Sequence, residues 1–288
     1  PKLEDILPSK NKMKKYLFEK QSPLNYQEVL RSYRACMKIE TGESVTGIPS
    51  NVSGDDLMTL KQILEKHRKE NGSFNSHLAE LENNLVEISA ERGNNTAIVL
   101  LCSRILTNVI DNNETIAYSQ EDKDHAQDLL KQLCGANFPL ALKVKGDLAY
   151  KIGHVDEAAK SYQSCIDANP SEINMITECY RSIGIIAMMN FDLNKAKNAF
   201  ENSISLGSRQ QVRDCYYYLG QLYEDDKLRS KYYLEIAASQ GLKEAFAPLG
   251  FLQLNYFNNP MLAEDWFKVG YEINDFNSCV GLFDVYMK

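Results

Sequence analysis

The sequence lacks long apolar runs and closely spaced cysteines. Its longest apolar stretch, residues 98–106, is short and contains Arg104, whereas a membrane-spanning helix needs about 20 mostly apolar residues. The chain has seven cysteines, an odd number, and none of them forms a CxxC pair, so no disulfide framework or common zinc-site spacing is present. We therefore expect no membrane-spanning helix, and reduced thiols in a reducing compartment.

An excess of positive charge is also missing. The formal net charge at pH 7 is -7 and the pI is about 5.3. A protein that binds duplex nucleic acid normally carries a basic face and a high pI. We therefore expect no nucleic-acid partner.

Side chains for catalysis or metal binding are scattered along the chain. The histidines at positions 67, 77, 125 and 154 form no HExxH or Cys/His metal motif, and we expect them on solvated helix surfaces. Gly42 and Gly47 have the spacing of a phosphate-binding loop, but Ile48 and Pro49 stand where lysine and a hydroxyl residue are required. We expect no enzymatic activity, no metal, no cofactor and no small-molecule substrate.

The first 74 residues differ in pattern from the rest of the chain. Residues 41–54 contain three glycines and a proline among small polar residues, which predicts a loop after an initial helical stretch. Residues 55–69 carry leucine and isoleucine at helical spacing and predict an amphipathic helix. We expect residues 1–74 to form an N-terminal helical segment, and residues 75–288 to form a repeat domain.

A lysine cluster lies near the start of the chain, at Lys10, Lys12, Lys14 and Lys15. Near-surface lysines attract anionic membranes, so this cluster is a candidate for peripheral membrane contact; the alternative is a solvated helix or tail. The sequence begins at Pro1 rather than at methionine. We therefore expect an upstream segment, in which any targeting sequence would lie.

The second half of the chain repeats itself, with a glycine as the landmark of each unit. A large residue and a glycine recur as Ile183-Gly184, Leu219-Gly220, Leu249-Gly250 and Val280-Gly281, at spacings of 36, 30 and 31 residues, and Gly146 precedes Gly184 by 38. Glycine inside a helix costs about 1 kcal/mol relative to alanine, so its recurrence indicates close helix packing.

A second landmark keeps the same phase. Ala158 is followed four residues later by Tyr162, and Ala196 by Phe200, again 38 residues apart. Small residues allow two helices to approach, and the aromatic residue one turn on fills the space beside them. Turn residues separate the units, so each unit is predicted to be a helix, a tight turn and a second helix.

The repeats resemble two related families. Residues 141–170 are similar to a tetratricopeptide repeat, and the matching residues are Leu142, Gly146, Tyr150, Gly153, Ala158, Tyr162, Cys165 and Pro170. Later units resemble Sel1-like repeats, in which an alanine-rich turn such as residues 237–241 precedes the next first helix. The resemblance implies an all-α fold, a right-handed superhelix of tetratricopeptide/Sel1-like helix pairs that follows an N-terminal helical extension.

More narrowly, the plan, the asparagine-rich composition and the repeat style resemble those of a fungal family of mitochondrial matrix factors. That family helps to export the C-terminal tail of cytochrome c oxidase subunit 2 across the inner membrane. The resemblance implies a non-enzymatic assembly factor in the matrix, peripheral to the inner membrane. Its implied partner is a protein client or an insertase of that membrane.

Two other interpretations remain open. One is a Sel1-like scaffold in a signalling or degradation complex of the cytosol or the ER lumen; N-x-S/T sequons at Asn51, Asn71, Asn94 and Asn113 would be relevant in the lumen. The other is an enzyme whose site lies within residues 1–74. That segment carries no recognisable catalytic constellation.

The first helix of each pair lines the concave face of such a superhelix. Residues on this helix that carry no packing landmark are therefore predicted to bind a partner: Lys143, Tyr150, Lys151, Arg181, Met188, Met189, Tyr217, Gln221, Phe251 and Asn255. The same faces also carry Asp147, Ile185, Glu224 and Leu254. Methionine repacks readily and aromatic residues anchor peptides, so an adaptable apolar floor is expected; the alternative for each position is core between helices.

A lysine-based clamp for a terminal carboxylate is not expected. Some tetratricopeptide domains hold a chaperone's terminal carboxylates with lysine and asparagine on adjacent first helices. Here Lys143 is followed one turn later by Asp147, which would repel a carboxylate.

Overall fold

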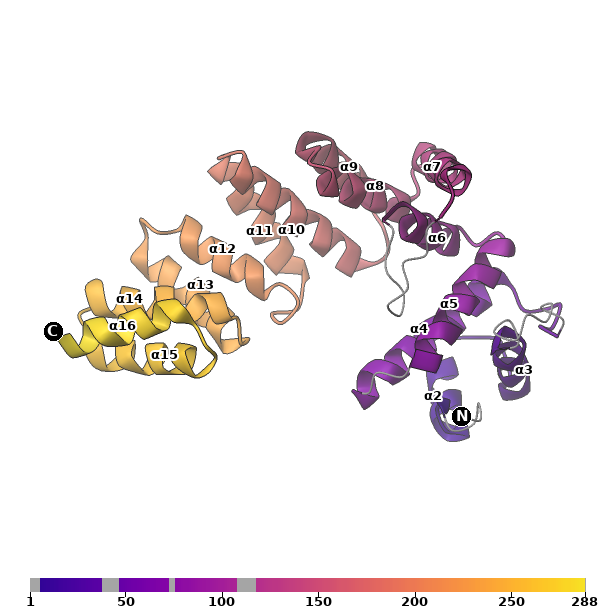
Figure 1. The fold of residues 1–288 in the computed structure, drawn as a ribbon, viewed down its shortest axis with the longest axis horizontal. Helices are drawn as coiled ribbons and strands as arrows, with labels where there is room; N and C mark the ends of the chain where they lie inside the picture. The colour runs from indigo at the N-terminus through magenta and orange to yellow at the C-terminus, as the bar shows by residue number, and fades with distance from the viewer. Residues whose placement is uncertain (1–5, 38–46, 73–75, 108–117, 288) are drawn as a thin grey trace. The chain divides into compact units, whose positions relative to one another are not determined.

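The computed structural model describes residues 6–37, 47–72, 76–107 and 118–287, and its regular elements in these ranges are all helices. This confirms the predicted all-α fold of helix pairs (Figure 1). The sequon at Asn113 and part of the loop predicted at 41–54 lie outside the described residues. In the first half the helices are α2 (Lys10–Glu19), α3 (Tyr26–Met37), α4 (Gly54–Asn71), α5 (Ser76–Glu91), α6 (Asn95–Thr107) and α7 (Gln120–Gly135).

The second half continues the pattern with four helix pairs and a further first helix in the described residues. The pairs are α8 (Pro139–Lys151) with α9 (Val155–Asp167), α10 (Ile173–Met189) with α11 (Leu193–Leu206), α12 (Arg213–Leu222) with α13 (Lys227–Ser239), and α14 (Phe246–Asn255) with α15 (Pro260–Glu272). A short 3-10 turn, η2 (Lys243–Ala245), precedes α14, and α16 (Phe276–Met287) packs on α14 and α15.

The chain divides into two compact units, residues 1–136 and 137–288. This division lies beyond the boundary predicted after residue 74, because α4 and α5, which flank residue 74, pack against each other. The boundary predicted after residue 74 marks where the repeats begin, which is a different question from where the compact units divide. It therefore stays a prediction. The two units are called unit 1 and unit 2 below.

Unit 1 has a core formed by α2, α3, α4 and α5. The amphipathic helix predicted at residues 55–69 is present within α4, where Leu57, Leu60 and Ile63 are fully buried. A reciprocal pair of hydrogen bonds between Ser53 and Asp56 caps its start, which satisfies backbone N–H groups that have no partner inside the helix.

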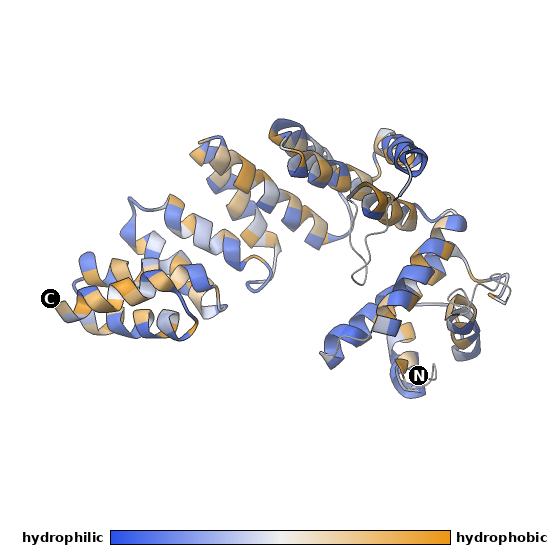
Figure 2. Cartoon of the chain, in the orientation of Figure 1, coloured by the Kyte–Doolittle hydropathy of each residue, from blue (hydrophilic) through white to orange (hydrophobic). Residues whose placement is uncertain are grey.

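Unit 2 is held together by the glycine landmarks. A Cβ atom added to Gly146 would lie 2.7 Å from the ring of Tyr162, and one added to Gly220 would lie 2.7 Å from Leu234. Phe267 on α15 packs in the same way on Gly250. The aromatic or leucine side chain of each second helix therefore covers the glycine of its own first helix. Hydrophobic and hydrophilic residues are interspersed along these helices (Figure 2).

Two expectations about single residue types have different outcomes. Cys102 and Cys165 are free and buried, which is consistent with the expected reduced thiols. His67, in contrast, was expected on a solvated surface and is buried. That expectation was wrong because His67 lies on the inner face of α4, edge-on to the ring of Tyr16 at 6.4 Å between centroids.

Candidate protein-binding site

The predicted partner-binding residues lie on the first helices of unit 2, namely α8, α10, α12 and α14, and they fall into two groups. The first group is exposed to solvent and consists of Tyr150, Lys151, Met189, Gln221 and Asn255. The second group is half-buried and consists of Lys143, Arg181, Met188, Tyr217 and Phe251.

The half-buried apolar members of the second group serve partly as core. Met188 and Tyr217 pack against the buried cluster of α10 to α14. Phe251 meets Phe267 edge-on, with 4.9 Å between the ring centroids. Leu254, expected on the groove face, is only 5% exposed, because it turns toward Ala263 and Phe267 of α15; that expectation was wrong.

One cavity of about 230 Å³ lies at the junction of α8, α9 and α10. Predicted residues Tyr150 and Arg181 contribute to its lining, together with Asp147 and Ile185. The Tyr150 hydroxyl lies 3.7 Å from the sulfur of Met189, so these two exposed side chains connect neighbouring repeats. The lining of this cavity thus combines aromatic rings, a carboxylate and a guanidinium.

Charges beside this cavity are paired across helices. The Lys143 ammonium lies 3.0 Å from the Asp147 carboxylate and 3.2 Å from that of Glu178. Burial opposes the positive charge of Lys143, but the two carboxylates outweigh it and raise the pKa of the ammonium group. With Lys143 held between two carboxylates, it is poorly placed to bind a carboxylate of a partner.

Arg181 is paired as well. Its guanidinium Nε lies 3.0 Å from the Asp214 carboxylate on α12. Arg181 therefore links α10 to α12, and it remains about two-fifths exposed at the side chain. Such half-exposed ion pairs contribute little stability, so Arg181 can reorient toward a bound segment at small cost.

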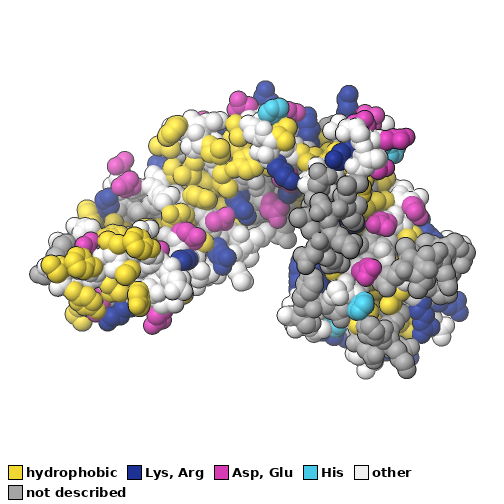
Figure 3. Space-filling model, viewed as in Figure 1, with side chains coloured by type: hydrophobic (Ala, Val, Ile, Leu, Met, Phe, Trp, Pro, Cys, Tyr) yellow, Lys and Arg dark blue, Asp and Glu magenta, His cyan; other side chains and the backbone are white. Residues whose placement is uncertain are grey.

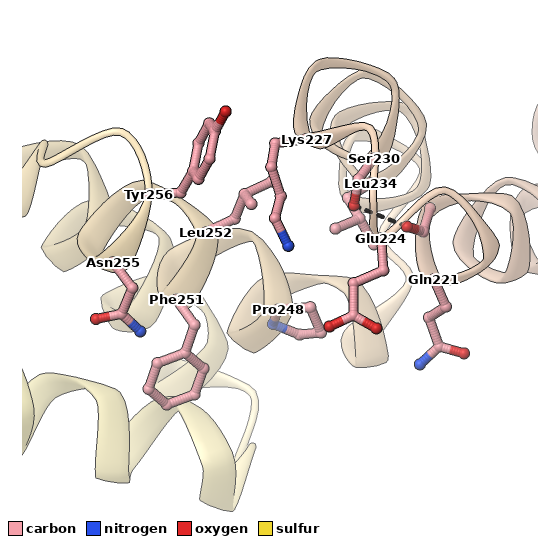
Figure 4. Close-up of a pocket in the computed structure, with 11 residues that line it drawn as sticks. Gln221, Glu224, Lys227, Ser230, Leu234, Pro248, Phe251, Leu252, Asn255 and Tyr256 are labelled. Carbon is pink, nitrogen blue, oxygen red and sulfur yellow. Dashed lines mark hydrogen bonds between the residues drawn. The ribbon is translucent and has the colours of Figure 1, made fainter.

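A larger cavity of about 620 Å³ lies between α12, α13 and α14 (Figure 4). Three predicted residues, Gln221, Phe251 and Asn255, line it. Figure 4 shows Lys227 and Glu224 extending into the space between these helices, and the Ser230 hydroxyl donating to the carbonyl oxygen of Gly220 at 2.7 Å. The lining is therefore mixed in polarity.

Sequence reasoning missed six of the residues that line this cavity, three of them on the second helix α13. The residues in question are Lys227, Ser230 and Leu234 of α13, and Pro248, Leu252 and Tyr256 on or beside α14. Lys227 could have been found from the sequence. It is the first residue of a second helix, directly after the loop that joins this helix to its first helix.

The comparisons with known proteins agree with this architecture. A family model described as the MSS2 N-terminal domain matches residues 1–94. The protein "Protein MSS2, mitochondrial" of Saccharomyces cerevisiae is 31% identical over 294 residues, an alignment that covers 100% of this chain and 82% of the yeast protein. The chain belongs to the MSS2 family. This confirms the narrower of the two resemblances seen in the sequence.

A solved structure of another protein has a similar fold. The crystal structure of a Sel1 repeat protein from Oxalobacter formigenes superposes with a TM-score of 0.55 at 15% sequence identity, and covers 87% of this chain and 100% of that one. MSS2 family membership and this Sel1-like repeat fold together support a protein-binding helical-repeat scaffold.

The MSS2 N-terminal match includes the lysine cluster on α2. Three of its four lysines have partners: Lys10 lies over the ring of Tyr26, Lys12 lies 3.1 Å from Glu70, and Lys15 lies 3.8 Å from Glu19. The cluster thus belongs to a folded helix, and two of its four lysine charges are paired with carboxylates. Membrane contact through these lysines stays a prediction.

Two kinds of feature are missing from the residues that the structure describes. In the described part of the chain, no group of three or more His, Cys, Asp or Glu side chains is arranged to hold a metal ion. Among the same residues, no helix is both long and apolar enough to cross a bilayer.

Proposed function

We propose that this member of the MSS2 family is a non-enzymatic assembly factor that holds a segment of another protein on the first helices of unit 2. The observation that carries the proposal is a row of exposed side chains on the first helices α8, α10, α12 and α14, namely Tyr150, Met189, Gln221 and Asn255. Tyr150 lines the smaller cavity, Gln221 and Asn255 line the larger one, and Met189 lies beside Tyr150. This row is called the groove row below.

The groove row suits an extended polypeptide segment. Gln221 and Asn255 each carry an amide, whose donors and acceptor are of the kind that matches the backbone groups of a peptide. The Gln221 amide also donates to the Tyr217 hydroxyl at 2.7 Å. Tyr150 supplies a rigid aromatic anchor and Met189 an adaptable apolar contact. The two apolar members lie on α8 and α10 and the two amide members on α12 and α14, so the row would bind a segment with an apolar part followed by a polar part.

We further propose where and on what the protein acts. The yeast relative is named as mitochondrial, and the sequence resembles matrix factors for export of the C-terminal tail of cytochrome c oxidase subunit 2. The protein would therefore work in the mitochondrial matrix, peripheral to the inner membrane. Its partner would be that tail or an insertase that translocates it.

Site-specific photo-crosslinking in isolated mitochondria tests this proposal. A photoreactive amino acid is placed at Met189 or Asn255, and at the exposed second-helix positions Lys160 and Asn202 as controls. We expect crosslinks to subunit 2 or to an inner-membrane insertase from the two groove positions, and none from the controls. Crosslinks that are equally strong from Lys160 would contradict the groove.

A functional arm uses substitutions at the same surface. The exposed positions are preferable to Met188 and Tyr217, because truncation of half-buried side chains also loosens the core. Met189→Ser with Asn255→Ala is expected to lower recovery of the client and accumulation of assembled oxidase, while Lys160→Ala with Asn202→Ala leaves both unchanged. A protein found only in the cytosol or ER lumen, with glycans or signalling partners, would reject the mitochondrial role in favour of the scaffold alternative.

A further inference from the structure

Large apolar side chains gather at one edge of unit 2, where each first helix turns into its second helix. Figure 3 shows hydrophobic side chains over α10 and α11 and again over the helices near the C-terminus. At the four turns between first and second helices, six apolar side chains are between 50% and 87% exposed, and others, such as Phe276 and Phe283 of α16, are exposed elsewhere in unit 2. The six side chains at the turns form what is called the apolar edge below: Ile152, Phe191, Leu193, Leu228, Tyr256 and Met261.

Phe191 is the most exposed member of the apolar edge, at 87%, and its backbone has a φ of +57°. The two equivalent turns, each one residue before the N-cap of the second helix, have Gly153 at φ +84° and Asn258 at φ +50°. Glycine and asparagine adopt this left-handed conformation readily, whereas it is strained for a bulky residue.

The turn between α10 and α11 does not require phenylalanine at position 191. The Phe191 and Asp192 amides donate to the carbonyl oxygens of Met188 and Ala187, and the amides of Gly153 and His154 make the same two bonds in the preceding unit. The same turn therefore forms with glycine. A strained aromatic residue that is exposed and dispensable for the turn indicates that its ring serves a contact outside the chain.

The charges along the apolar edge cancel. At the turns that precede α11 and α13, three acidic residues, Asp192, Asp225 and Asp226, lie close in sequence to three basic ones, Lys195, Lys227 and Arg229. The Arg229 guanidinium lies 3.3 Å from the Asp226 carboxylate. Electrostatic attraction to an anionic surface is therefore weak here, and any contact made by this edge is driven by its apolar side chains.

We infer that the apolar edge docks on the surface of a lipid bilayer, with its side chains inserted at the boundary between headgroups and acyl chains. Exposed aromatic and aliphatic side chains insert to this depth in proteins that lie on membranes. The backbone N–H groups at the turn of Phe191 are hydrogen-bonded within the chain, which such a location requires.

A bilayer fits this edge better than a protein partner does. The six side chains project from four successive turns rather than from one pocket. A protein would need a complementary cavity for each of these separate side chains, whereas a fluid apolar layer accepts them all. The inference deepens the peripheral membrane location proposed above, and moves the contact from the lysines of α2 to unit 2.

Vesicle flotation with the purified full chain tests the inference, with vesicles of phosphatidylcholine alone and with vesicles that also contain an anionic phospholipid. We expect binding to both, with little change between low and high salt, because charge contributes little. Phe191→Asn combined with Ile152→Asn is expected to lower the vesicle-bound fraction about tenfold or more. Asparagine suits the backbone at position 191, so the variant keeps its fold, which circular dichroism verifies.

The matched control is Ile173→Asn, which removes an exposed isoleucine from the opposite edge of unit 2, at the start of α10. This variant is expected to bind vesicles as the unaltered chain does. Binding that requires anionic lipid and disappears in high salt would overturn the inference and favour the lysine cluster. No binding to either vesicle would overturn it too, and photo-crosslinks at Phe191 in mitochondria would then mark the edge as a protein-docking surface.

Failure of this inference is distinguishable from failure of the proposed function. Vesicle binding depends on neither a mitochondrial setting nor the groove row. A chain that binds vesicles through Phe191 but makes no crosslinks from Met189 supports the apolar edge and rejects the groove. The reverse result supports the groove and rejects the apolar edge.

Discussion

The ring of Phe200 on α11 packs directly on Gly184 of α10, so that a Cβ atom added at Gly184 would lie 2.6 Å from the Cε1 atom of that ring. Phe200 is fully buried, and it stacks on Tyr218 of α12 with 5.1 Å between the ring centroids. This aromatic ring therefore joins one repeat to the next as well as the two helices of its own pair.

Gly184→Ala is expected to lower the free energy of unfolding by about 1–3 kcal/mol, because the added methyl group overpacks the site. Alanine's better helix propensity, worth about 1 kcal/mol, offsets only part of this loss. Urea denaturation followed by circular dichroism measures the change. In a Phe200→Leu background, Gly184→Ala should lower the free energy of unfolding by less, because the smaller leucine leaves room beside Gly184. An equal loss of stability in both backgrounds would show that the two residues are not coupled.

This relationship explains how much of the fold the sequence could predict. The spacings from Gly146 to Gly184 and from Tyr162 to Phe200 are local properties of the chain, and both identify the packing between the helices of one pair. The exposure of Met188 or Leu254 depends instead on neighbouring helices whose tilt no spacing reveals. The residues predicted to bind a partner lie on first helices, as the spacing implied, but five of them are half-buried, and Leu254 on the same face is buried.

The apolar edge was missed for a different reason. Phe191 occupies the position that Gly153 occupies 38 residues earlier, and a glycine in one repeat aligned with an aromatic residue in the next is visible in the sequence. Its meaning depends on the positive φ of both residues, which only the structure gives. The burial of His67 likewise depends on how α2 covers α4.

Replacement of Phe191 is expected to stabilise the protein. Phe191→Asn should raise the free energy of unfolding by about 1 kcal/mol, because the left-handed conformation costs a bulky L-residue about 1–2 kcal/mol. The converse change, Gly153→Ala, should lower it by about 1 kcal/mol through backbone strain alone, since nothing lies within 4 Å of an added Cβ. Thermal or urea denaturation measures both; a destabilised Phe191→Asn variant would mean that the ring supports the fold.

Cysteine reactivity is expected to differ sharply within one chain. Burial raises the pKa of the thiols of Cys36 and Cys215 to about 12, and the thiolate is the reactive form. Cys279 is exposed on α16. A short pulse of iodoacetamide at pH 8 should therefore modify Cys279 first, and mass spectrometry of peptides reads out the order. Rapid modification of Cys215 in the folded protein would contradict the packing of α12 against α11.

The stability of unit 1 is expected to depend on pH through Glu65. Burial alone would raise the pKa of this carboxyl, but hydrogen bonds from Lys61 and Lys69, each at 2.7 Å, outweigh burial and lower the pKa from 4.5 to about 2. A pKa depressed by folding stabilises the folded state above the unfolded value. This contribution is therefore complete above about pH 4.5 and disappears as the pH falls toward 2.

Glu65→Gln isolates this contribution. At pH 7 it should lower the free energy of unfolding by only about 0.5–1 kcal/mol, because the three side chains on α4 remain partly exposed and solvent screens them. Between pH 4.5 and 2 the loss of stability should be shallower than in the unaltered chain. Urea denaturation at a series of pH values measures how the free energy of unfolding changes with pH, and the exposed Glu91→Gln is the control. If Glu65→Gln and the unaltered chain showed the same pH dependence, the pKa of Glu65 would be the same in the folded and unfolded chains. The two lysines would then not stabilise this carboxylate.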